Sequence, residues 1–361
     1  MTVRRFIESD VPSVVELFER VYPEYRWSSP AELSAYFRQV FFEGPWRHLD
    51  LPSWIAVESD GACGFAGIVP RAMTFDGRPI KVGVGAQLMV APDRRHSLVA
   101  LQLVKRTLTG PQDLFVTDGA NDSAMRLWAG VGGAVPALQN LHWTRPLRPF
   151  RYGLDLLARS GPLRAVSRVA RAPGRLADAL AARAHPNRFH QPEPSLTDVP
   201  LDVETMLIAL NGVGGRQCLL RPCYDADSLG WLLEQVARKK RHGRLRARAV
   251  FDHGTLLGWF LYYAEPGTVN EVVQIGAVGA SFDRVLRQLM VDAWRQGATA
   301  LRGRIDPSHV EQLSDRHCWF RREGSWTLAH SRHADIVAAI ERGAAGFSRL
   351  EGEWWLRFQG G

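Results

Sequence analysis

The chain has 361 residues, 46% apolar and 23% charged, a composition typical of globular proteins and a length that suits two domains of ordinary size. We expect no signal peptide and no membrane-spanning helix, because the first residues carry charge throughout and no run of about 18 apolar residues occurs, so a cytoplasmic location is expected. The net charge of +8 favours acidic partners such as nucleotides or tRNA, although it comes almost entirely from arginine, which a GC-rich genome also produces.

The sequence contains four cysteines, at Cys63, Cys218, Cys223 and Cys318. They are too few and too scattered for a disulfide framework, and the pair at 218 and 223 lacks the spacing of a zinc site. We expect them to be reduced and structural, and we expect no bound metal.

Residues 1–145 alternate strand and helix patterns. A short strand, "TVRRF", precedes a helix whose apolar positions from Val14 to Val21 follow helical spacing after a cap at Ser9 or Asp10. A loop region rich in aromatic residues follows, and residues 53–90 then read as three strands joined by turns at 59–61 and 76–77. This order predicts an antiparallel meander.

The stretch "VAPDRRHSLVALQL", Val90 to Leu103, follows the last strand of this meander. Pro92 ends the strand and the next residues favour a helix, whose first N–H groups would point at an anion. Two arginines at the mouth could pair with phosphate oxygens in the forked geometry of a guanidinium. The pattern predicts a phosphate-binding turn formed by Leu88, Met89, Val90, Arg94, Arg95, His96, Ser97, Leu98, Val99 and Ala100.

Residues 146–199 consist of short helical stretches interrupted by Gly and Pro. Arg164, Arg168, Arg171 and Arg175 would lie on one side of an unbroken helix, but Pro173-Gly174 argues that the helix is broken. A basic stripe for a phosphate-rich partner is one interpretation. We favour the other, a solvated linker.

Residues 200–361 repeat the plan of the first block. A helix over 224–239, capped by Asp225 or Asp227, is followed by two strands joined through 252–254, a third strand, a helix, a strand and a short helix opening at Asp306-Pro307. The sequence therefore predicts an α/β (α+β) fold of two tandem domains, 1–145 and 200–361. Each would be a mixed, mostly antiparallel sheet flanked by helices, and the Arg-rich helical linker at 146–199 would join them.

The order of elements in the first domain resembles that of the GNAT acyltransferase superfamily. Its turn typically reads Val-x-Pro-x-x-Arg-Gly-x-Gly-x-Gly/Ala, and Val90, Pro92, Arg95 and Ala100 match it. His96 and Leu98 occupy the glycine positions. If Leu98 has helical dihedral angles the backbone donors survive, whereas a left-handed conformation there would break the phosphate cradle.

A second GNAT signature, Asn-x-x-Ala-x-x-Leu-Tyr-x-x-x-Gly-Phe, is similar to "NDSAMRLWAGVGG". Asn121 matches its first position, Trp128 replaces the tyrosine and Gly133 replaces the phenylalanine. In the family that tyrosine often gives a proton to the departing thiolate, which an indole N–H cannot do at neutral pH. We therefore interpret Trp128 as a core residue rather than as a wall for the acyl chain.

The resemblance implies that acyl-CoA, most simply acetyl-CoA, binds along residues 88–100 with Asn121 and Trp128 nearby. The backbone amides of Met89 or Val90 would polarise the thioester carbonyl, and a small-molecule or peptide amine would accept the acyl group between the domains. An enzyme of this kind also needs a base for the amine. Candidate catalytic side chains are Glu271, Tyr262 and Asp118.

Two alternatives to this N-acetyltransferase hypothesis stay open. Tandem GNAT architecture is similar to that of mycothiol synthase, N-myristoyltransferase and the Fem-type aminoacyltransferases, so the donor could be an aminoacyl-tRNA or an acyl carrier protein. The lost glycines and tyrosine would also permit a catalytically inactive GNAT-fold scaffold. The sequence does not predict the oligomeric state.

Overall fold

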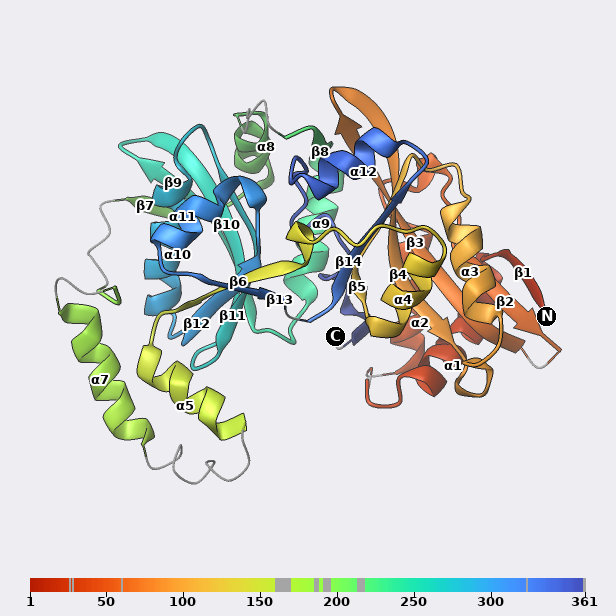
Figure 1. Cartoon of the computed structure of the whole chain (residues 1–361), viewed down its shortest axis with the longest axis horizontal. Helices are drawn as coiled ribbons and strands as arrows, with labels where there is room; N and C mark the ends of the chain where they lie inside the picture. The colour runs from red at the N-terminus through yellow and green to blue at the C-terminus, as the bar shows by residue number, and fades with distance from the viewer. Residues whose placement is uncertain are drawn as a thin grey trace. The chain divides into compact units, whose positions relative to one another are not determined.

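The computed structural model (Figure 1) describes residues 1–25, 27, 29–59, 61–159, 170–184, 188–190, 196–212, 218–322 and 324–359. The chain divides into two compact units, each assembled from separated segments. Unit 1 comprises Met1–Asn140, Arg216–Arg241 and Gly324–Gly361, and unit 2 comprises Leu141–Gly215 and His242–Glu323.

Unit 1 contains a mixed sheet in which β4 and β5 are the one parallel pair among the described strands. Its strands, in spatial order, are β1 (Thr2–Arg5), β2 (Trp54–Glu58), β3 (Gly61–Phe75), β4 (Arg78–Val90), β5 (Leu114–Ala120) and β14 (Trp326–Ser331), with β8 (Leu220–Pro222) beside β3. Its helices are α1 (Val11–Val21), α2 (Pro30–Phe41), α3 (Val99–Leu108), α4 (Asp122–Gly130), α9 (Ala226–Arg238) and α12 (Ala334–Glu341).

Helices cover both faces of this sheet, because successive residues of a strand point to opposite sides. On β3, Gly64 lies against Val99 and Leu103 of α3, whereas the Phe65 ring packs against the Phe37 ring of α2, with centroids 5.9 Å apart. The sheet is thus the middle layer of unit 1.

The expected loop between the first helix and the meander is in fact a helix, α2. Ser29 caps it by accepting a hydrogen bond from the Glu32 N–H (3.1 Å), and Pro30 takes the first helical position. The aromatic residues that suggested a loop form the buried face of this helix, Tyr36 and Phe37 among them. The expected meander is confirmed, since β2, β3 and β4 pair antiparallel in succession. Asp76 and Gly77 both have positive φ in the β3–β4 turn.

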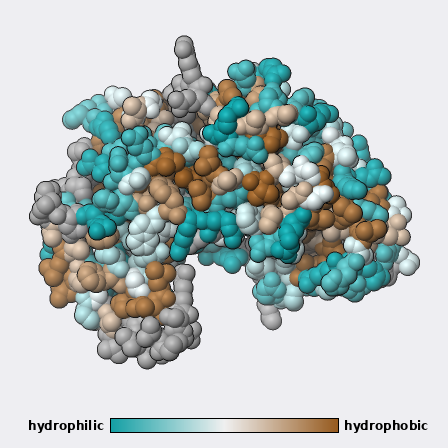
Figure 2. All heavy atoms as spheres, in the orientation of Figure 1, coloured by the Kyte–Doolittle hydropathy of each residue, from teal (hydrophilic) through white to brown (hydrophobic). Residues whose placement is uncertain are grey.

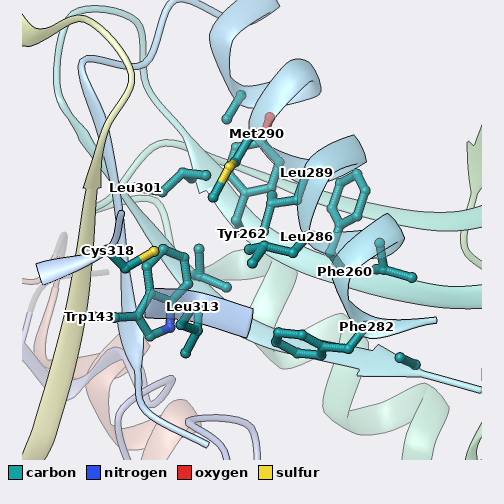
Figure 3. Packing of buried hydrophobic residues seen from close by; sticks show 14 of the residues in the cluster. Trp143, Phe260, Tyr262, Phe282, Leu286, Leu289, Met290, Leu301, Leu313 and Cys318 are labelled. Carbon is teal, nitrogen blue, oxygen red and sulfur yellow. The ribbon is translucent and has the colours of Figure 1, made fainter. Parts of the chain in front are cut away.

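Unit 2 contains a second mixed sheet, in which β11 and β12 form the one parallel pair between strands that the structure describes. Its strands, in spatial order, are β13 (Trp319–Arg322), β6 (Leu141–Pro146), β12 (Ala300–Arg304), β11 (Val269–Ala277), β10 (Thr255–Ala264), β9 (Arg244–Asp252) and β7 (Thr197–Pro200). Figure 3 shows α10 (Phe282–Arg295) packing Leu286 and Leu289 against Phe260 and Tyr262 of β10. Two mixed, mostly antiparallel sheets flanked by helices confirm the predicted fold class.

Each unit contains a strand that the chain order would assign to the other unit. The predicted domain boundaries at residues 145 and 200 do not include this exchange. β6 follows unit 1 in the chain but pairs with β12 and β13, and β14 follows unit 2 but pairs with β5. α9 also belongs to unit 1. The reason is that strand pairing between distant segments, and not the order of elements along the chain, decides which sheet a strand joins.

Two helices of unit 2 lie within the segment that the sequence suggested as a linker, α5 (Pro149–Arg159) and α7 (Arg171–Arg183). Pro173 is accommodated in the first turn of α7, and Asp178 of α7 accepts a hydrogen bond from the Phe150 N–H (2.9 Å). Apolar side chains on both helices are exposed and gather at the lower left of Figure 2, among them Phe150, Leu157, Leu176 and Leu180. The interpretation of Arg164 and Arg168 lies outside the described residues.

Candidate active site

A gap opens between β4 and β5 in unit 1. The two strands pair in parallel only where Val82, Gly83 and Val84 meet residues 114–116. Beyond these pairs β4 continues to Val90 and β5 to Ala120 without joining. We call the space between their carboxyl ends the β4–β5 gap.

A β-bulge lies on β4 beside this gap. The β3–β4 register shifts between Phe65 and Gly67, so that one residue of β3 faces Gln87 and Leu88 of β4. Gln87 has φ 57°, a left-handed conformation that costs a non-glycine residue about 1 kcal/mol or more. The bulge turns the Gln87 backbone out of the sheet ladder.

A carboxylate from the far end of the chain fills the β4–β5 gap. Glu353 accepts hydrogen bonds from the Thr117 hydroxyl and the Gly119 N–H (3.1 Å) on β5, and the backbone of Gln87 on β4 also hydrogen-bonds it. A Cβ at Gly119 would lie 2.6 Å from Glu353 Oε1, so glycine makes room for the carboxylate. Glu353 therefore bridges the two strands at the point where they have separated.

Burial and charge set the protonation of this carboxylate. Burial and, to a smaller extent, the negative charge of Asp118 raise the pKa of Glu353 to about 8, against the lowering effect of hydrogen bonds from Thr117, Gln87 and Gly119. A carboxyl group with this pKa can gain and lose a proton near neutral pH, as a general base must.

Asp118, a predicted catalytic residue, anchors the segment that carries Glu353. Its buried carboxylate accepts hydrogen bonds from the Glu353 N–H (2.6 Å) and the Trp354 N–H (3.1 Å). A Cβ at Gly352 would lie 2.2 Å from Asp118 Oδ2, so only glycine fits there. We call residues 347–359 the return segment. Asp118 thus lies in the site, where its charge and its backbone contacts position Glu353.

The predicted phosphate-binding turn joins β4 to α3. Leu98, the residue before the helix, has φ −79° and ψ 2°, which is a right-handed conformation, and it is 64% exposed. The first intrahelical bond runs from Gln102 N–H to Leu98 C=O (2.9 Å), so the N–H groups of residues 99–101 precede the helical ladder. The bulk of Leu98 therefore neither reverses the backbone nor buries the start of the helix.

The two arginines of the turn have different partners. Arg94 forms ion pairs with Glu58 (3.0 Å) and Asp93 (2.7 Å), which neutralise much of its charge. Arg95 is exposed and makes no ion pair with any described residue. The first turn of α3 contains no acidic residue. Arg95 is therefore the arginine that can meet an anion at this helix start.

Tyr22 responds to charges in both the turn and the gap. Burial, with a smaller contribution from the charge of Glu353, raises the pKa of Tyr22 to about 12, and the charge of Arg95 opposes this rise. Tyr22 therefore lies close enough to both side chains to sense their charges, and it holds its proton at neutral pH.

Asn121 and Trp128, both predicted at the cofactor site, have structural contacts. Asn121 is exposed and caps α4 by accepting a hydrogen bond from the Ala124 N–H (2.9 Å). Trp128 is buried against Phe115, with ring centroids 5.3 Å apart. The interpretation of Trp128 as a core residue is confirmed.

The other two predicted catalytic residues belong to unit 2. The Tyr262 hydroxyl donates to Asp292 Oδ2 (2.6 Å), and burial raises the pKa of Tyr262 well above its usual value. Glu271, also buried, accepts a hydrogen bond from Arg302 Nε (2.9 Å). Both side chains are engaged within the unit 2 sheet and its helix, and their catalytic role stays a prediction.

Unit 2 also contains a parallel strand pair that joins over only three residues, but the helix that follows its first strand begins differently from α3. β11 and β12 pair only at residues 269–271 and 300–302, but the first turn of α10 carries Asp283, which is unfavourable for an anion. Unit 1 is thus the better anion site of the two.

Three residues of this site escaped the sequence analysis: Gln87, Tyr22 and Glu353. Gln87 was missed because the bulge there depends on the register between β4 and β3. Tyr22 was missed because it follows the first helix and belongs to no recognisable motif. The one local signal for Glu353 is "EGEWW", a carboxylate between glycine and two tryptophans at the end of the sequence.

No metal centre is formed by the part of the chain that the structure describes, since no three His, Cys, Asp or Glu side chains there are grouped to hold an ion. The four cysteines, all within that part, form no disulfide with one another. None of the described helices combines the length and the apolar composition of a membrane span.

Comparison with solved structures shows that the fold of the chain is similar to that of GCN5-related N-acetyltransferases. No family model and no curated protein matches the sequence. A GCN5-related N-acetyltransferase from Anabaena variabilis has a TM-score of 0.60 at 11% identity, covering 92% of this chain and 73% of that one.

Two further structures give the same result. A GCN5-related N-acetyltransferase from Kribbella flavida has a TM-score of 0.56 at 13% identity over 91% of this chain and 70% of its own. A probable N-acyltransferase from Enterococcus faecalis has a TM-score of 0.58 at 9% identity over 91% of this chain and 72% of its own. At these identities the likeness establishes the fold.

Proposed function

We propose that the protein is an N-acyltransferase that takes an acyl group, most simply acetyl, from acyl-CoA bound by unit 1 and transfers it to an amine. The observation that carries the proposal is the β4–β5 gap, with a titratable carboxylate inside it and an acid-free helix start beside it. The names of the structural neighbours agree with this reaction class.

The turn supplies the donor site. The N–H groups that open α3 and the exposed Arg95 would receive the pyrophosphate of CoA, because a helix start and a guanidinium both favour phosphate oxygens. Leu98 points into solvent and leaves this approach open. The amides of Met89 or Val90, which follow the bulge, would polarise the thioester carbonyl.

Glu353 acts as the base. Its ionised carboxylate accepts the proton that the amine loses as the new amide bond forms, and Tyr22 can donate a proton to the departing thiolate. Because only the ionised form of Glu353 is a base, kcat/KM is expected to rise as the pH increases through about 8. Glu353→Gln should lower kcat by about 10² to 10⁴-fold and remove this rise.

Calorimetry with acetyl-CoA and with CoA tests the donor, and release of free CoA in the presence of amines tests the reaction. We expect both ligands to bind and amine-dependent release to follow. No binding at millimolar ligand would exclude the donor, and binding without turnover with any amine would favour the inactive scaffold. Binding of aminoacyl-tRNA that weakens steeply with salt would favour a tRNA-borne donor instead.

A further inference from the structure

A buried arginine in unit 1 has no hydrogen-bond partner. Arg71 on β3 is 3% exposed, and its carbon Cζ lies over the Trp46 ring (4.2 Å) and the Trp355 ring (5.2 Å). Its nitrogens Nε, Nη1 and Nη2 have no acceptor among the described residues. Burying an unpaired charge is costly, so this guanidinium needs an explanation.

Further unpartnered polar groups gather around Trp355. The buried Trp355 Nε1 has no acceptor in the described part of the chain, and the ring packs edge-on against Trp231 of α9, with centroids 5.8 Å apart. Gln235, one helical turn beyond Trp231 and therefore on the same face, is also buried with both amide atoms unpartnered. Guanidinium, indole and amide together offer many donors and a single acceptor, so the group lacks an acceptor-rich partner.

The nearest carboxylates are already engaged. Glu351 accepts hydrogen bonds from the Tyr224 hydroxyl (2.9 Å) and the Ser348 N–H (2.7 Å), and Asp118 holds the return segment. Their charges oppose the effect of burial, which lowers the pKa of Arg71 to about 10. Arg71 therefore stays charged at neutral pH without a direct anionic partner.

We propose that Arg71, Gln235 and Trp355 bind the carboxylate of the amine acceptor, so that the acceptor is an amino acid or a closely similar amino-carboxylate. The two indole rings cover the guanidinium carbon and leave the outward N–H groups for a planar, bidentate carboxylate. One buried positive charge matches the single charge of a carboxylate better than the higher charge of a phosphate. This inference rests on the proposed function.

The return segment contributes to the proposed binding of both the amine and the carboxylate of such an acceptor. Glu353, the proposed base, is two residues from Trp355, so an amine at Glu353 and a carboxylate at Arg71 would belong to one small molecule. Trp46, Trp231 and Trp355 supply an apolar surround for its side chain. Because these groups are buried, binding of the acceptor requires the structure to open around them.

Acyl transfer to L-leucine and L-phenylalanine, each compared with its carboxamide, tests the inference on the full chain. We expect kcat/KM to be at least tenfold higher for the acids than for the amides. Arg71→Met should reduce this preference to below twofold, whereas Arg47→Met, at an exposed arginine beside Trp46, should leave it unchanged. Equal use of acids and amides by the wild type would overturn the carboxylate site.

Binding without the donor separates this inference from the proposed function. Calorimetry should show L-leucine or L-phenylalanine binding the free protein and losing at least fivefold in affinity with Gln235→Leu, even though that change removes unpartnered polar groups and should raise the melting temperature. Binding unaffected by Gln235→Leu, or a preference for inorganic phosphate, would contradict the assignment. If the amino acids bind in this way but acetyl-CoA does not, the proposed function fails and the carboxylate site stands.

Discussion

At the scale of single residues, Trp128 and Gly133 show how two departures from a motif compensate each other. The GNAT signature has tyrosine and phenylalanine at these positions. A Cβ at Gly133 would lie 1.5 Å from Trp128 Cδ1, so the larger indole occupies the space that a side chain at 133 would need. The two changes therefore preserve the packing beneath β14, while they remove the hydroxyl that a tyrosine would supply.

Gly133→Ala should accordingly destabilise unit 1. The added methyl group meets the Trp128 ring, and overpacking of this kind costs about 1 to 3 kcal/mol. Urea unfolding measures the loss, and Gly130→Ala is a matched control because a Cβ there meets nothing within 4 Å. Equal stability of the two variants would contradict the packing argument.

Substitution of Arg95 tests whether the predicted turn binds the acyl donor. If its guanidinium receives the pyrophosphate, Arg95→Ala should weaken CoA binding by about 1.5 to 3 kcal/mol, the usual value of a charged hydrogen bond. Lys105→Ala, in the last turn of the same helix, keeps the net charge equal and should leave binding unchanged. Calorimetry compares the two, and an unaffected Arg95→Ala would move the donor elsewhere.

At the scale of secondary structure, elements with local signals were predictable and those built by distant contacts were not. Asp225, one of the two residues expected to cap α9, does so, and the strands of both meanders follow alternation and turn residues. Helix α2 was not predicted because its aromatic residues obscured the cap at Ser29. Strand β14 was not predicted because it pairs with the distant β5 and not with a strand joined to it by a tight turn. Local patterns identify elements, whereas pairing across the chain decides how the elements assemble.

The cap of α4 separates a structural role from a binding role. Asn121→Ala should lower the free energy of unfolding by about 1 kcal/mol, because it removes the acceptor of the Ala124 N–H. If the cap is its whole contribution, the affinity for CoA should change by less than twofold. Asn121→Asp retains an acceptor and should restore the stability. A large loss of CoA affinity in Asn121→Ala would support the cofactor contact that the motif implies.

The return segment makes stability depend on pH. The pKa of Glu353 rises from an ordinary 4.5 to about 8 on folding, so its contribution to stability is fully present below pH 4.5 and is lost as the pH rises through 8. Within this window the free energy of unfolding should fall by about 1.4 kcal/mol for each pH unit on account of this group. Glu353→Gln should remove this part of the slope.

Chemical denaturation at several pH values measures this effect. Glu341→Gln, an exposed carboxylate on α12, serves as the control and should keep the wild-type slope. A wild-type slope in Glu353→Gln would show that the carboxylate of Glu353 is ionised throughout the range.

At the scale of the whole molecule, the candidate site depends on residues that are far apart in the sequence. Thr117 and Glu353, which share a hydrogen bond, are separated by 236 positions. The turn could be predicted, because it is one continuous stretch with a recognisable helix start. The position of the Glu353 carboxylate in the gap could not be predicted, because no sequence pattern near residue 353 indicates a contact with β5.

A chain of residues 1–145 should not fold on its own. It lacks β14, which pairs with β5, and the buried residues Leu328, Trp355 and Phe358. We expect near-UV circular dichroism of this fragment to lack tertiary signal, whereas the full chain should unfold cooperatively. A folded fragment that binds CoA would show that the later segments are dispensable for unit 1.

The exchange of strands also has a consequence during synthesis. β5 leaves the ribosome about 200 residues before β14, a delay on the order of 10 to 40 s at usual translation rates. Throughout that interval one edge of a hydrophobic sheet has no neighbour, which makes the nascent chain a natural client for chaperones. Glu353, which completes the gap, follows Gly119 of β5 by 234 residues, so the base that we propose cannot enter the site before that stretch has been synthesised.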